Sequence, residues 1–412
     1  MENSSKKKVL IFLHKFPYPD TDSTKFRIWN SVILPLKKHF DIKIFVVTYE
    51  NIKKEDLIFL KNIAPLDFYI FPKWRFFLNI LLNLFSLRPF QTEMWFFKRV
   101  FLRFQEEAKK FDVIYIHTVR LGKYIEKLSP ELREKIILDF NDSIAMHYLN
   151  GWKYYPLLLK MPILLEGLKL YFYEKKIFKM LNKFCIVSNF DKNFIIKNIS
   201  EDIVKRKTFI VTYTSARTYD FNKNQNKLNI DLSKHYICFL GNLRYYPNYE
   251  GISHFLKDIW PKICEEIKEL EFFIIGHVSK KISDEFKNVK RVQLLGFVED
   301  IYPVLKNSLA VISPVRIGAG IQGKVIQAMA IGKLVISYPQ GVNELDGFKN
   351  LENIIICKRN NEEDWLKYLK FILENEDKVI KIQEEAKKLF LEKFSIDSVS
   401  KRYFELFKEF LN

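Results

Sequence analysis

Short apolar runs alternate along most of the chain with longer segments in which apolar residues recur at helical spacing. The runs are nearly continuous in apolar residues, which is typical of strands buried on both faces of a parallel sheet. Two successive strand–helix series of similar length predict an α/β protein with two doubly wound domains. The predicted strands are 9–13, 42–48, 68–71, 113–117, 136–140 and 184–188 in the first series, and 236–240, 272–275, 292–295, 309–313, 334–337 and 354–357 in the second.

The boundary between the two series is predicted in the stretch 215–233, which contains a polar run without helical period at 220–227. We place an N-terminal domain at 1–206, a C-terminal domain at 207–385 and a closing segment at 386–412. Within the closing segment, apolar residues follow a helical spacing over 396–411, which predicts a helix that packs against another part of the chain.

The charge of the chain is strongly positive and unevenly distributed. The formal net charge is +18 over 412 residues, and residues 1–200 carry 34 Lys and Arg against 20 Asp and Glu. Such a balance is typical of proteins that meet nucleic acid, an anionic membrane surface or anionic ligands. A compositional bias toward Lys is the alternative explanation. No nucleic-acid-binding motif is recognised and the charge is scattered along helices, so we expect no nucleic-acid partner.

Two segments of the basic half, 74–90 and 154–171, mix aromatic, aliphatic and basic residues, as interfacial helices do. Helices packed on the sheet are the alternative. No run of about 18 uncharged apolar residues and no signal-peptide pattern is found. We therefore expect a cytoplasmic protein, or one attached to the inner face of the cytoplasmic membrane. The four cysteines form no CxxC pair, so no metal site is predicted.

The segment from Ser313 to Ala330 carries the clearest chemical pattern. A strand ends at Ser313, a loop with three glycines follows, and a helix begins near Gly323. Glycines let backbone N–H groups approach an anion, and a helix N-terminus adds partial positive charge. Arg316 and Lys324 flank the loop, and each can pair with a phosphate oxygen. The pattern predicts a diphosphate site, with a tight turn between strand and helix as the alternative.

The run from Arg316 to Val335 resembles the donor-site signature of GT-B glycosyltransferases of the family 4 group. The similarity is greatest to the bacterial branch found in exopolysaccharide and cell-surface glycan loci. Further segments resemble other motifs of the same family: 241–248, 272–276, 295–300 and 341–344.

The resemblance implies two Rossmann-like domains that face one another across a cleft, with the closing helix crossing back to the first domain. It implies transfer of a sugar from a nucleotide sugar to a glycan or lipid-linked acceptor in cell-surface polysaccharide synthesis. The reaction would retain anomeric configuration and require neither a metal nor a cofactor. An anionic or lipid-linked acceptor suits the basic first half.

Three residues are candidates for catalysis: Arg316 and Lys324, which would stabilise the departing diphosphate, and His117, which ends a predicted strand. The family's histidine at a corresponding strand end contacts the donor sugar, while a purely structural histidine is the alternative. The candidates for substrate binding are Gly241, Asn242, Arg244, Gly276, Phe297, Val298, Gly318, Ala319, Gly320, Ile321 and Gln327.

One departure from the family concerns Gln327 and Ala319. The family usually carries a glutamate at each of these positions, and the later one accepts both ribose hydroxyls. The difference keeps open two alternatives to a transferase. One is a non-catalytic GT-B subunit that binds a nucleotide sugar or a partner transferase at the membrane, and the other is an enzyme such as a nucleotide-sugar epimerase.

Overall fold

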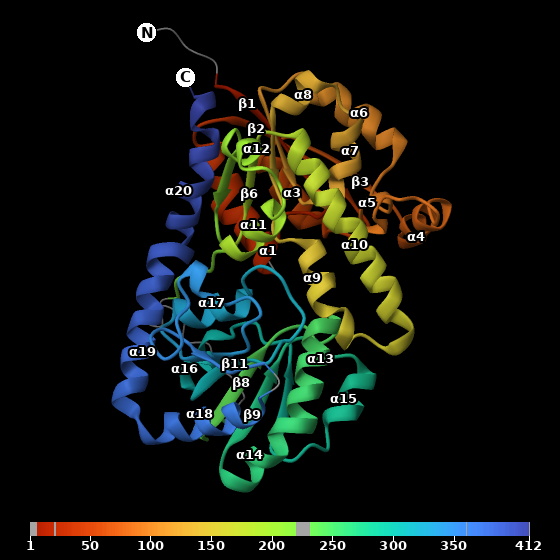
Figure 1. The fold of residues 1–412 in the computed structure, drawn as a ribbon. Coiled ribbons are helices and arrows are strands. Elements are labelled where there is room, and N and C mark those ends of the chain that lie inside the picture. Colours follow the sequence, from red (N-terminus) through yellow and green to blue (C-terminus); the bar gives the residue numbers. More distant parts are fainter. Residues whose placement is uncertain (1–5, 20–21, 220–230, 360, 412) are drawn as a thin grey trace, which may run out of the picture. The chain divides into compact units, whose positions relative to one another are not determined.

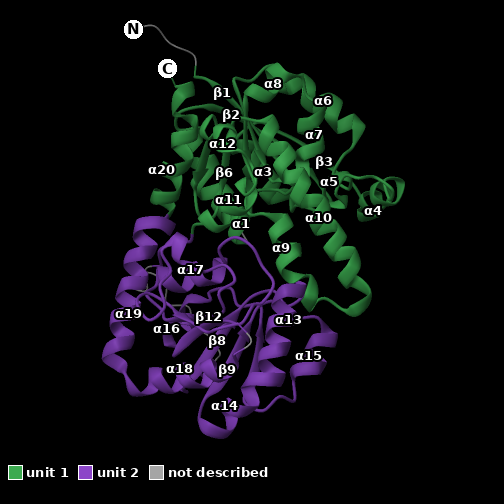
Figure 2. Ribbon diagram, viewed as in Figure 1, with its two compact units in different colours: residues 1–215, 396–412 green, residues 216–395 purple. Residues whose placement is uncertain are grey.

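The computed structural model describes residues 6–19, 22–219, 231–359 and 361–411. The chain divides into two compact units, which are coloured separately in Figure 2. Unit 1 comprises residues 1–215 and 396–412, and unit 2 comprises residues 216–395.

A parallel sheet of seven strands forms the centre of unit 1, in the order β3-β2-β1-β4-β5-β6-β7 (Figure 1). The apolar residues of β1 and β4 are almost completely buried, as their unbroken apolar sequence predicts. The strands are β1 (Lys8–Leu13), β2 (Asp41–Thr48), β3 (Leu66–Ile70), β4 (Val113–His117), β5 (Ile136–Asp139), β6 (Lys183–Ile186) and β7 (Thr208–Val211).

Helices connect these strands, and the last helix of the chain joins them in unit 1. They are α1 (Ser23–Arg27), α2 (Leu34–Lys37), α3 (Lys54–Ile63), α4 (Lys73–Leu82), α5 (Phe90–Glu93), α6 (Lys98–Ala108), α7 (Gly122–Lys127), α8 (Pro130–Glu134), α9 (Ile144–Gly151), α10 (Leu157–Met180), α11 (Asn189–Ile196), α12 (Glu201–Lys205) and α20 (Ile396–Phe407). Helix α20 buries Val399, Tyr403, Leu406 and Phe407, which share one face.

Unit 2 has a parallel sheet of six strands in the order β10-β9-β8-β11-β12-β13. The strands are β8 (Tyr236–Leu240), β9 (Glu271–Ile275), β10 (Val292–Gly296), β11 (Ala310–Ser313), β12 (Val335–Ser337) and β13 (Ile355–Ile356). The helices are α13 (Tyr246–His254), α14 (Trp260–Glu266), α15 (Lys280–Phe286), α16 (Tyr302–Asn307), α17 (Gly323–Ala330), α18 (Glu363–Glu374) and α19 (Glu376–Leu389). Buried aromatic residues, among them Phe255, Trp260 and Trp365, fill the space between sheet and helices.

Each sheet is doubly wound, because its strand order reverses beside its first strand. In unit 1 the reversal lies between β1 and β4, and in unit 2 it lies between β8 and β11. Ligands of open parallel sheets bind beyond the carboxyl ends of the strands at such a reversal. The fold therefore points to the loops after these four strands.

Every strand predicted from the apolar runs overlaps a strand of the structure, but the sequence analysis missed β7. The omission also displaced the domain boundary, which the structure puts after Ser215 rather than after residue 206, because β7 pairs with β6 in the first sheet. The later division falls after Ser395 rather than after residue 385, because Ser395 pairs with Ala216 in unit 2. The polar run at 220–227 lies outside the described residues.

Candidate active site

The residues predicted to bind the donor lie beyond the carboxyl ends of four neighbouring strands of unit 2. Gly241, Asn242 and Arg244 follow β8, and Gly276 follows β9. Phe297 and Val298 follow β10, while the loop at 314–322 follows β11. Parallel strands place these ends at one edge of the sheet, so the topology collects segments that are far apart in sequence.

The loop between β11 and α17 is held in shape by hydrogen bonds of Gln322. Ser313 Oγ donates to Gln322 Oε1 at 2.6 Å, and Gln322 Nε2 donates to the carbonyl of Gln340 at 2.8 Å. Gly320 adopts a φ of 68°, in the left-handed region that glycine occupies without strain. The loop leads directly into the N-terminus of α17, where the helix dipole favours binding of an anion.

Lys324 lies in the first turn of α17, and its ammonium group is largely shielded from water. Its Nζ donates to Asn248 Oδ1 at 2.9 Å and lies 4.2 Å from the ring centre of Phe239. Burial lowers the pKa of Lys324 to about 7. An anionic ligand at this ammonium favours the charged form and therefore raises that pKa again.

Arg316 lies in the loop, and its guanidinium pairs with the buried carboxylate of Glu250 on α13. The carbonyl of Arg316 accepts a hydrogen bond from Arg359 Nη2 at 2.7 Å. Both ends of the arginine are thus attached to neighbouring elements. The glutamate orients the guanidinium and shares its positive charge.

Asn248 and Glu250 contact the two predicted cationic residues, and neither was among the predicted site residues. Asn248 falls inside a segment that resembles the family, and Glu250 follows it by two residues on α13. One signal in the sequence could have indicated these roles. Both residues are polar and lie among residues expected to be buried, and a buried polar group needs a hydrogen-bonding partner.

The loops after β8, β9 and β10 are joined by close backbone approaches. Asn248 Nδ2 donates to the carbonyl of Asn242 at 3.0 Å. Because Asn248 also accepts a hydrogen bond from Lys324, its side chain links this lysine to the loop after β8. The amide of Gly276 donates to the carbonyl of Gly296 at 2.7 Å. A Cβ atom on Gly276 would lie 2.2 Å from the carbonyl oxygen of Gly241, so glycine is required for this approach.

The remaining predicted residues of unit 2 differ in their exposure. Phe297 is exposed, and its ring stacks on that of His277 with centroids 5.2 Å apart. Gln327 is half-buried on α17, one turn after Lys324. Gly318 and Ala319 are half-buried in the loop, whereas Ile321 is buried.

In unit 1, His117 ends β4 at the reversal of the strand order and is almost completely buried. Its Nε2 lies 3.3 Å from Nη2 of Arg27, and its ring stacks on that of His14 with centroids 5.5 Å apart. Burial lowers the pKa of His117 to about 4 and also lowers the pKa of His14. A guanidinium only donates, so the neutral His117 ring accepts at Nε2 and carries its proton on Nδ1.

Asp139 is the centre of the polar network that positions Arg27 beside His117. Its Oδ2 accepts hydrogen bonds from Arg27 Nη1 at 2.8 Å, from Tyr115 Oη at 2.5 Å and from Tyr403 Oη at 3.0 Å. Four donors, counting the amide of Asn141 on Oδ1, satisfy this fully buried carboxylate. His117 belongs to unit 1, and the diphosphate candidates belong to unit 2.

Among the described residues, His254, Asp258 and Glu362 form a group whose ligand atoms lie within 4.8 Å of one another. Both ring nitrogens of His254 have hydrogen-bonding partners. Nδ1 lies 2.7 Å from Asp258 Oδ2, and Nε2 lies 3.2 Å from Tyr338 Oη. Hydrogen bonding accounts for the position of His254 without an ion.

Residues 234–375 match the family model described as glycosyl transferases group 1. The whole fold is similar to that of sucrose-phosphate synthase from Thermosynechococcus elongatus, with a TM-score of 0.70 at 11% identity, over 98% of this chain and 99% of that one. It is also similar to HepE from Anabaena in complex with UDP and glucose, with a TM-score of 0.64 at 11% identity, over 98% of this chain and 99% of that one. The chain therefore has the GT-B fold, and its second unit carries the glycosyl transferases group 1 region.

The chain has curated relatives of low identity. It is 22% identical over 359 residues to an uncharacterized 44.6 kDa protein in the cps region of Klebsiella pneumoniae. This alignment covers 85% of this chain and 87% of the relative. It is 27% identical over 260 residues to an uncharacterized glycosyltransferase of Methanocaldococcus jannaschii, over 59% of this chain and 63% of the relative. The matched region contains the loops of unit 2 described above.

Proposed function

We propose that the glycosyltransferase moves a sugar from a nucleotide-sugar donor to a hydroxyl group of a glycan or lipid-linked acceptor in cell-surface polysaccharide synthesis. One observation carries the proposal: the cationic residues Arg316 and Lys324 border a glycine loop and a helix N-terminus at the carboxyl edge of the second sheet. This arrangement suits a diphosphate, because it supplies cationic and backbone donors together.

In the proposed reaction, the bond between the anomeric carbon and the diphosphate oxygen breaks, and the diphosphate leaves with the electron pair. The acceptor oxygen bonds to the anomeric carbon and passes its proton to the departing diphosphate oxygen. Negative charge therefore develops on the diphosphate, where fixed donors stabilise the transition state. Arg316, Lys324 and the loop amides supply those donors, so the proposed reaction needs no metal ion. Retention of anomeric configuration is part of the proposal and follows the family resemblance.

We assign His117 a role as hydrogen-bond donor rather than as general base. Its Nε2 faces Arg27, and its pKa of about 4 keeps the ring neutral at physiological pH. The remaining ring atom that can act on a ligand is the Nδ1–H group, which donates. A sugar hydroxyl is the partner that we propose for it.

The acceptor is proposed from charge and from relatives. The first 200 residues carry 34 basic against 20 acidic residues, which favours an anionic or lipid-linked acceptor. The relative in the cps region of Klebsiella pneumoniae supports a role in surface polysaccharide synthesis. We propose that the enzyme works at the inner face of the cytoplasmic membrane. No helix among the described residues is long and apolar enough to span a bilayer.

A donor panel tests the proposal. UDP-, GDP-, ADP- and CMP-sugars are added to the purified protein, and the unfolding temperature is measured, since a ligand that binds the folded state stabilises it by mass action. UDP-sugars come first, because HepE was solved with UDP and glucose. We expect one class to raise the unfolding temperature and to be hydrolysed slowly, with the same rate in EDTA. Absence of any response contradicts the donor site, and loss of hydrolysis in EDTA contradicts metal independence.

A further inference from the structure

Helix α10 exposes a stripe of apolar residues to solvent along one face. Leu157, Met161, Leu165, Leu168 and Phe172 are all exposed, and their spacing of three and four residues puts them on one side of the helix. This stripe is roughly 22 Å long at 1.5 Å per residue. From Glu166 onward the opposite face of α10 is buried in unit 1, so this part of the helix is packed and the stripe is an additional surface.

A second exposed apolar segment comprises α4 and the loop that follows it. Its large side chains Trp74, Phe77, Leu81 and Leu82 are exposed, and Phe85 and Leu87 in the loop are exposed by 96% and 92%. Figure 1 shows α4 at the periphery of unit 1. Side chains of this size are seldom so exposed in one place unless the surface has a binding role.

The two segments are attached to each other at Lys169. Its Nζ donates to the carbonyl of Ser86 at 2.8 Å and lies 4.5 Å from the ring centre of Phe90. Glu166, one turn earlier on α10, accepts the amides of Phe90 and Gln91. The loop with Phe85 and Leu87 is therefore fixed beside the stripe of α10, and we call the two segments together the apolar surface.

The charges of the apolar surface have one sign. Residues 73–88 contain three basic residues and no acidic one. Residues 153–180 contain six lysines and two glutamates, and both glutamates, Glu166 and Glu174, are buried. The exposed side of these segments therefore presents positive charge beside apolar side chains.

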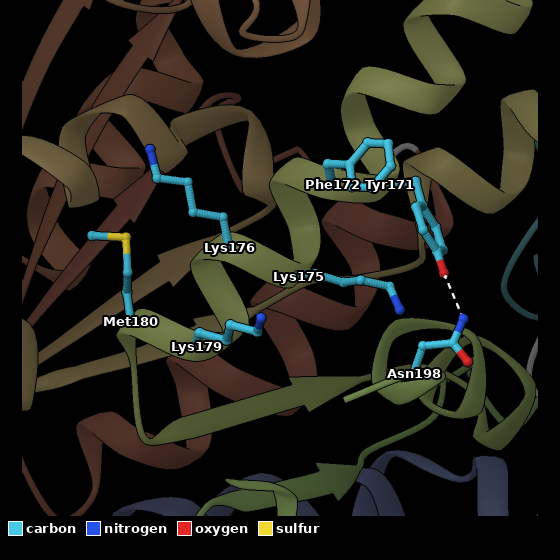
Figure 3. A pocket seen from close by; sticks show the side chains of 7 residues that line it. All are labelled: Tyr171, Phe172, Lys175, Lys176, Lys179, Met180 and Asn198. Carbon is cyan, nitrogen blue, oxygen red and sulfur yellow. Dashed lines mark hydrogen bonds between the residues drawn. The ribbon is translucent and has the colours of Figure 1, made fainter. Parts of the chain in front are cut away.

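The apolar stripe leads directly into a group of lysines. Lys175, Lys176 and Lys179 continue along α10 past Phe172 and line a hollow of about 550 Å³ with Tyr171 and Asn198 (Figure 3). Lys176 pairs with Glu126, which also accepts from Arg88 Nε at 2.9 Å, so this acid offsets only part of the local charge.

We propose that the apolar surface docks on an anionic lipid bilayer, with the α10 stripe and the α4 loop in the acyl-chain boundary and Lys175, Lys176 and Lys179 at the lipid phosphates. Aliphatic side chains gain by leaving water for acyl chains, and exposed lysines are attracted to anionic headgroups. A second copy of this surface would bring like charges together, which disfavours self-association. Nucleic acid is disfavoured along the α10 stripe, because four of the five side chains named for it are leucine or methionine, which offer neither charge nor a stacking plane.

This inference deepens the proposed function by naming the surface that brings the enzyme to the membrane. Its test uses the full chain without any donor or acceptor. A failure of docking therefore leaves sugar transfer unaffected, and a failure of the donor panel leaves docking unaffected.

The experiment measures co-sedimentation of the protein with two kinds of vesicle. One kind is neutral and contains phosphatidylcholine alone, and the other is anionic and contains phosphatidylcholine with about 30% phosphatidylglycerol. We expect at least about tenfold tighter binding to the anionic vesicles, weakening with salt. Leu165→Glu/Phe172→Glu should lower binding at least about tenfold. Lys175→Glu/Lys179→Glu should reduce it to the level of neutral vesicles. Brominated lipids should quench the tryptophan fluorescence of the bound wild type. The quenched component should be that of Trp74, and it should therefore be missing in Trp74→Phe.

Two matched controls use exposed residues of unit 2. Leu373→Glu on α18 and Lys281→Glu on α15 should bind like the wild type, and all variants should keep its unfolding temperature. Three results overturn the proposal. The first is equal binding to both vesicle types. The second is a dimer that Leu165→Glu/Phe172→Glu makes monomeric while vesicles are ignored. The third is tighter binding to a single-stranded oligonucleotide than to vesicles.

Discussion

The hydroxyl group of Tyr403 donates a 3.0 Å hydrogen bond to Oδ2 of Asp139, although 264 residues separate the two in the chain. Both side chains are buried in unit 1. The bond links α20 to the carboxylate that orients Arg27, and through Arg27 to His117. The last helix of the chain thus contributes to the candidate site in the first unit.

Tyr403→Phe tests this link. The variant removes one of the donors of a buried carboxylate, while Arg27 and Tyr115 keep theirs. We expect the free energy of unfolding to fall by about 1–3 kcal/mol, the usual value for a hydrogen bond to a charged group. Tyr171→Phe is the control, because the bonds of its hydroxyl, such as that from Asn198 at 3.5 Å, lie at the surface. Denaturant unfolding compares both, and equal stability of Tyr403→Phe and wild type would contradict the role of the bond.

Arg316→Ala and Lys324→Ala should each raise the activation free energy of transfer by about 2–4 kcal/mol, the loss expected for one fixed donor to a developing anion. The two variants should differ in stability. Arg316→Ala leaves the buried Glu250 without its ion-pair partner, which lowers the free energy of unfolding by about 1–3 kcal/mol. Steady-state kinetics and denaturant unfolding measure both effects, with Lys281→Ala as control. Full turnover in either variant removes that residue from the proposed role.

Binding of a nucleoside diphosphate should depend on pH through Lys324. The free lysine has a pKa of about 7, and the bound diphosphate favours its ammonium form. Above pH 7 the lysine must take up a proton on binding, so affinity should fall by up to about tenfold for each pH unit. Lys324→Arg stays charged and should bind without proton uptake. Calorimetry in two buffers of different ionisation enthalpy at pH 8 measures the uptake, and its absence in the wild type would refute this prediction.

The same lowered pKa has an effect on stability of known sign. The folded state binds fewer protons at Lys324 than the unfolded state between about pH 7 and the ordinary pKa of lysine near 10.4. The contribution of Lys324 to the free energy of unfolding therefore rises with pH in that window and is flat below it. Lys324→Met should remove this slope, and urea unfolding at several pH values between 6 and 9.5, roughly spanning the window, tests it.

Gln327 is expected to contact the donor ribose, as an amide with one acceptor oxygen and two N–H donors. Gln327→Glu should tighten donor binding by about 0.5–1.5 kcal/mol, because a carboxylate makes charge-assisted bonds to the hydroxyls. Gln327→Ala should weaken it by about 1–3 kcal/mol. Calorimetry with the donor identified by the panel measures the affinity of the wild type and of both variants. Equal affinity of Gln327→Ala and wild type would rule out the ribose contact.

Gly276 and Gly318 both lie in loops of the candidate donor site, but they differ in the space available for a Cβ atom. Gly276 has a φ of 133°, and an added Cβ would lie 2.2 Å from the carbonyl oxygen of Gly241, whereas a Cβ on Gly318 meets nothing within 4 Å. Gly276→Ala should therefore destabilise the protein by about 2–3 kcal/mol or more. Gly318→Ala should change stability by less than about 1 kcal/mol. Unfolding curves of the two variants compare them, and similar losses in both would contradict the close approach.

The strands of both sheets could be predicted because their apolar runs are local and unbroken, as in Val113–His117. The missed strand β7 is an edge strand of four residues, and its first residue is exposed. A run that short, half-buried at a sheet edge, leaves little apolar signal. The donor loop was predictable for a different reason, since Arg316, three glycines and Lys324 lie within nine consecutive residues.

The sequence by itself determined the α/β pattern, the two strand–helix series and the position of a cationic glycine loop at a strand end, because each depends on residues close together in the chain. Only the tertiary structure decided which partners hold those groups. Glu250 reaches Arg316 across 66 positions and Tyr403 reaches Asp139 across 264, and no local spacing encodes such pairs. The structure also decided which side of α10 is exposed, because the packing of unit 1 buries Glu166 and Glu174 and leaves leucines such as Leu165 and Leu168 in water.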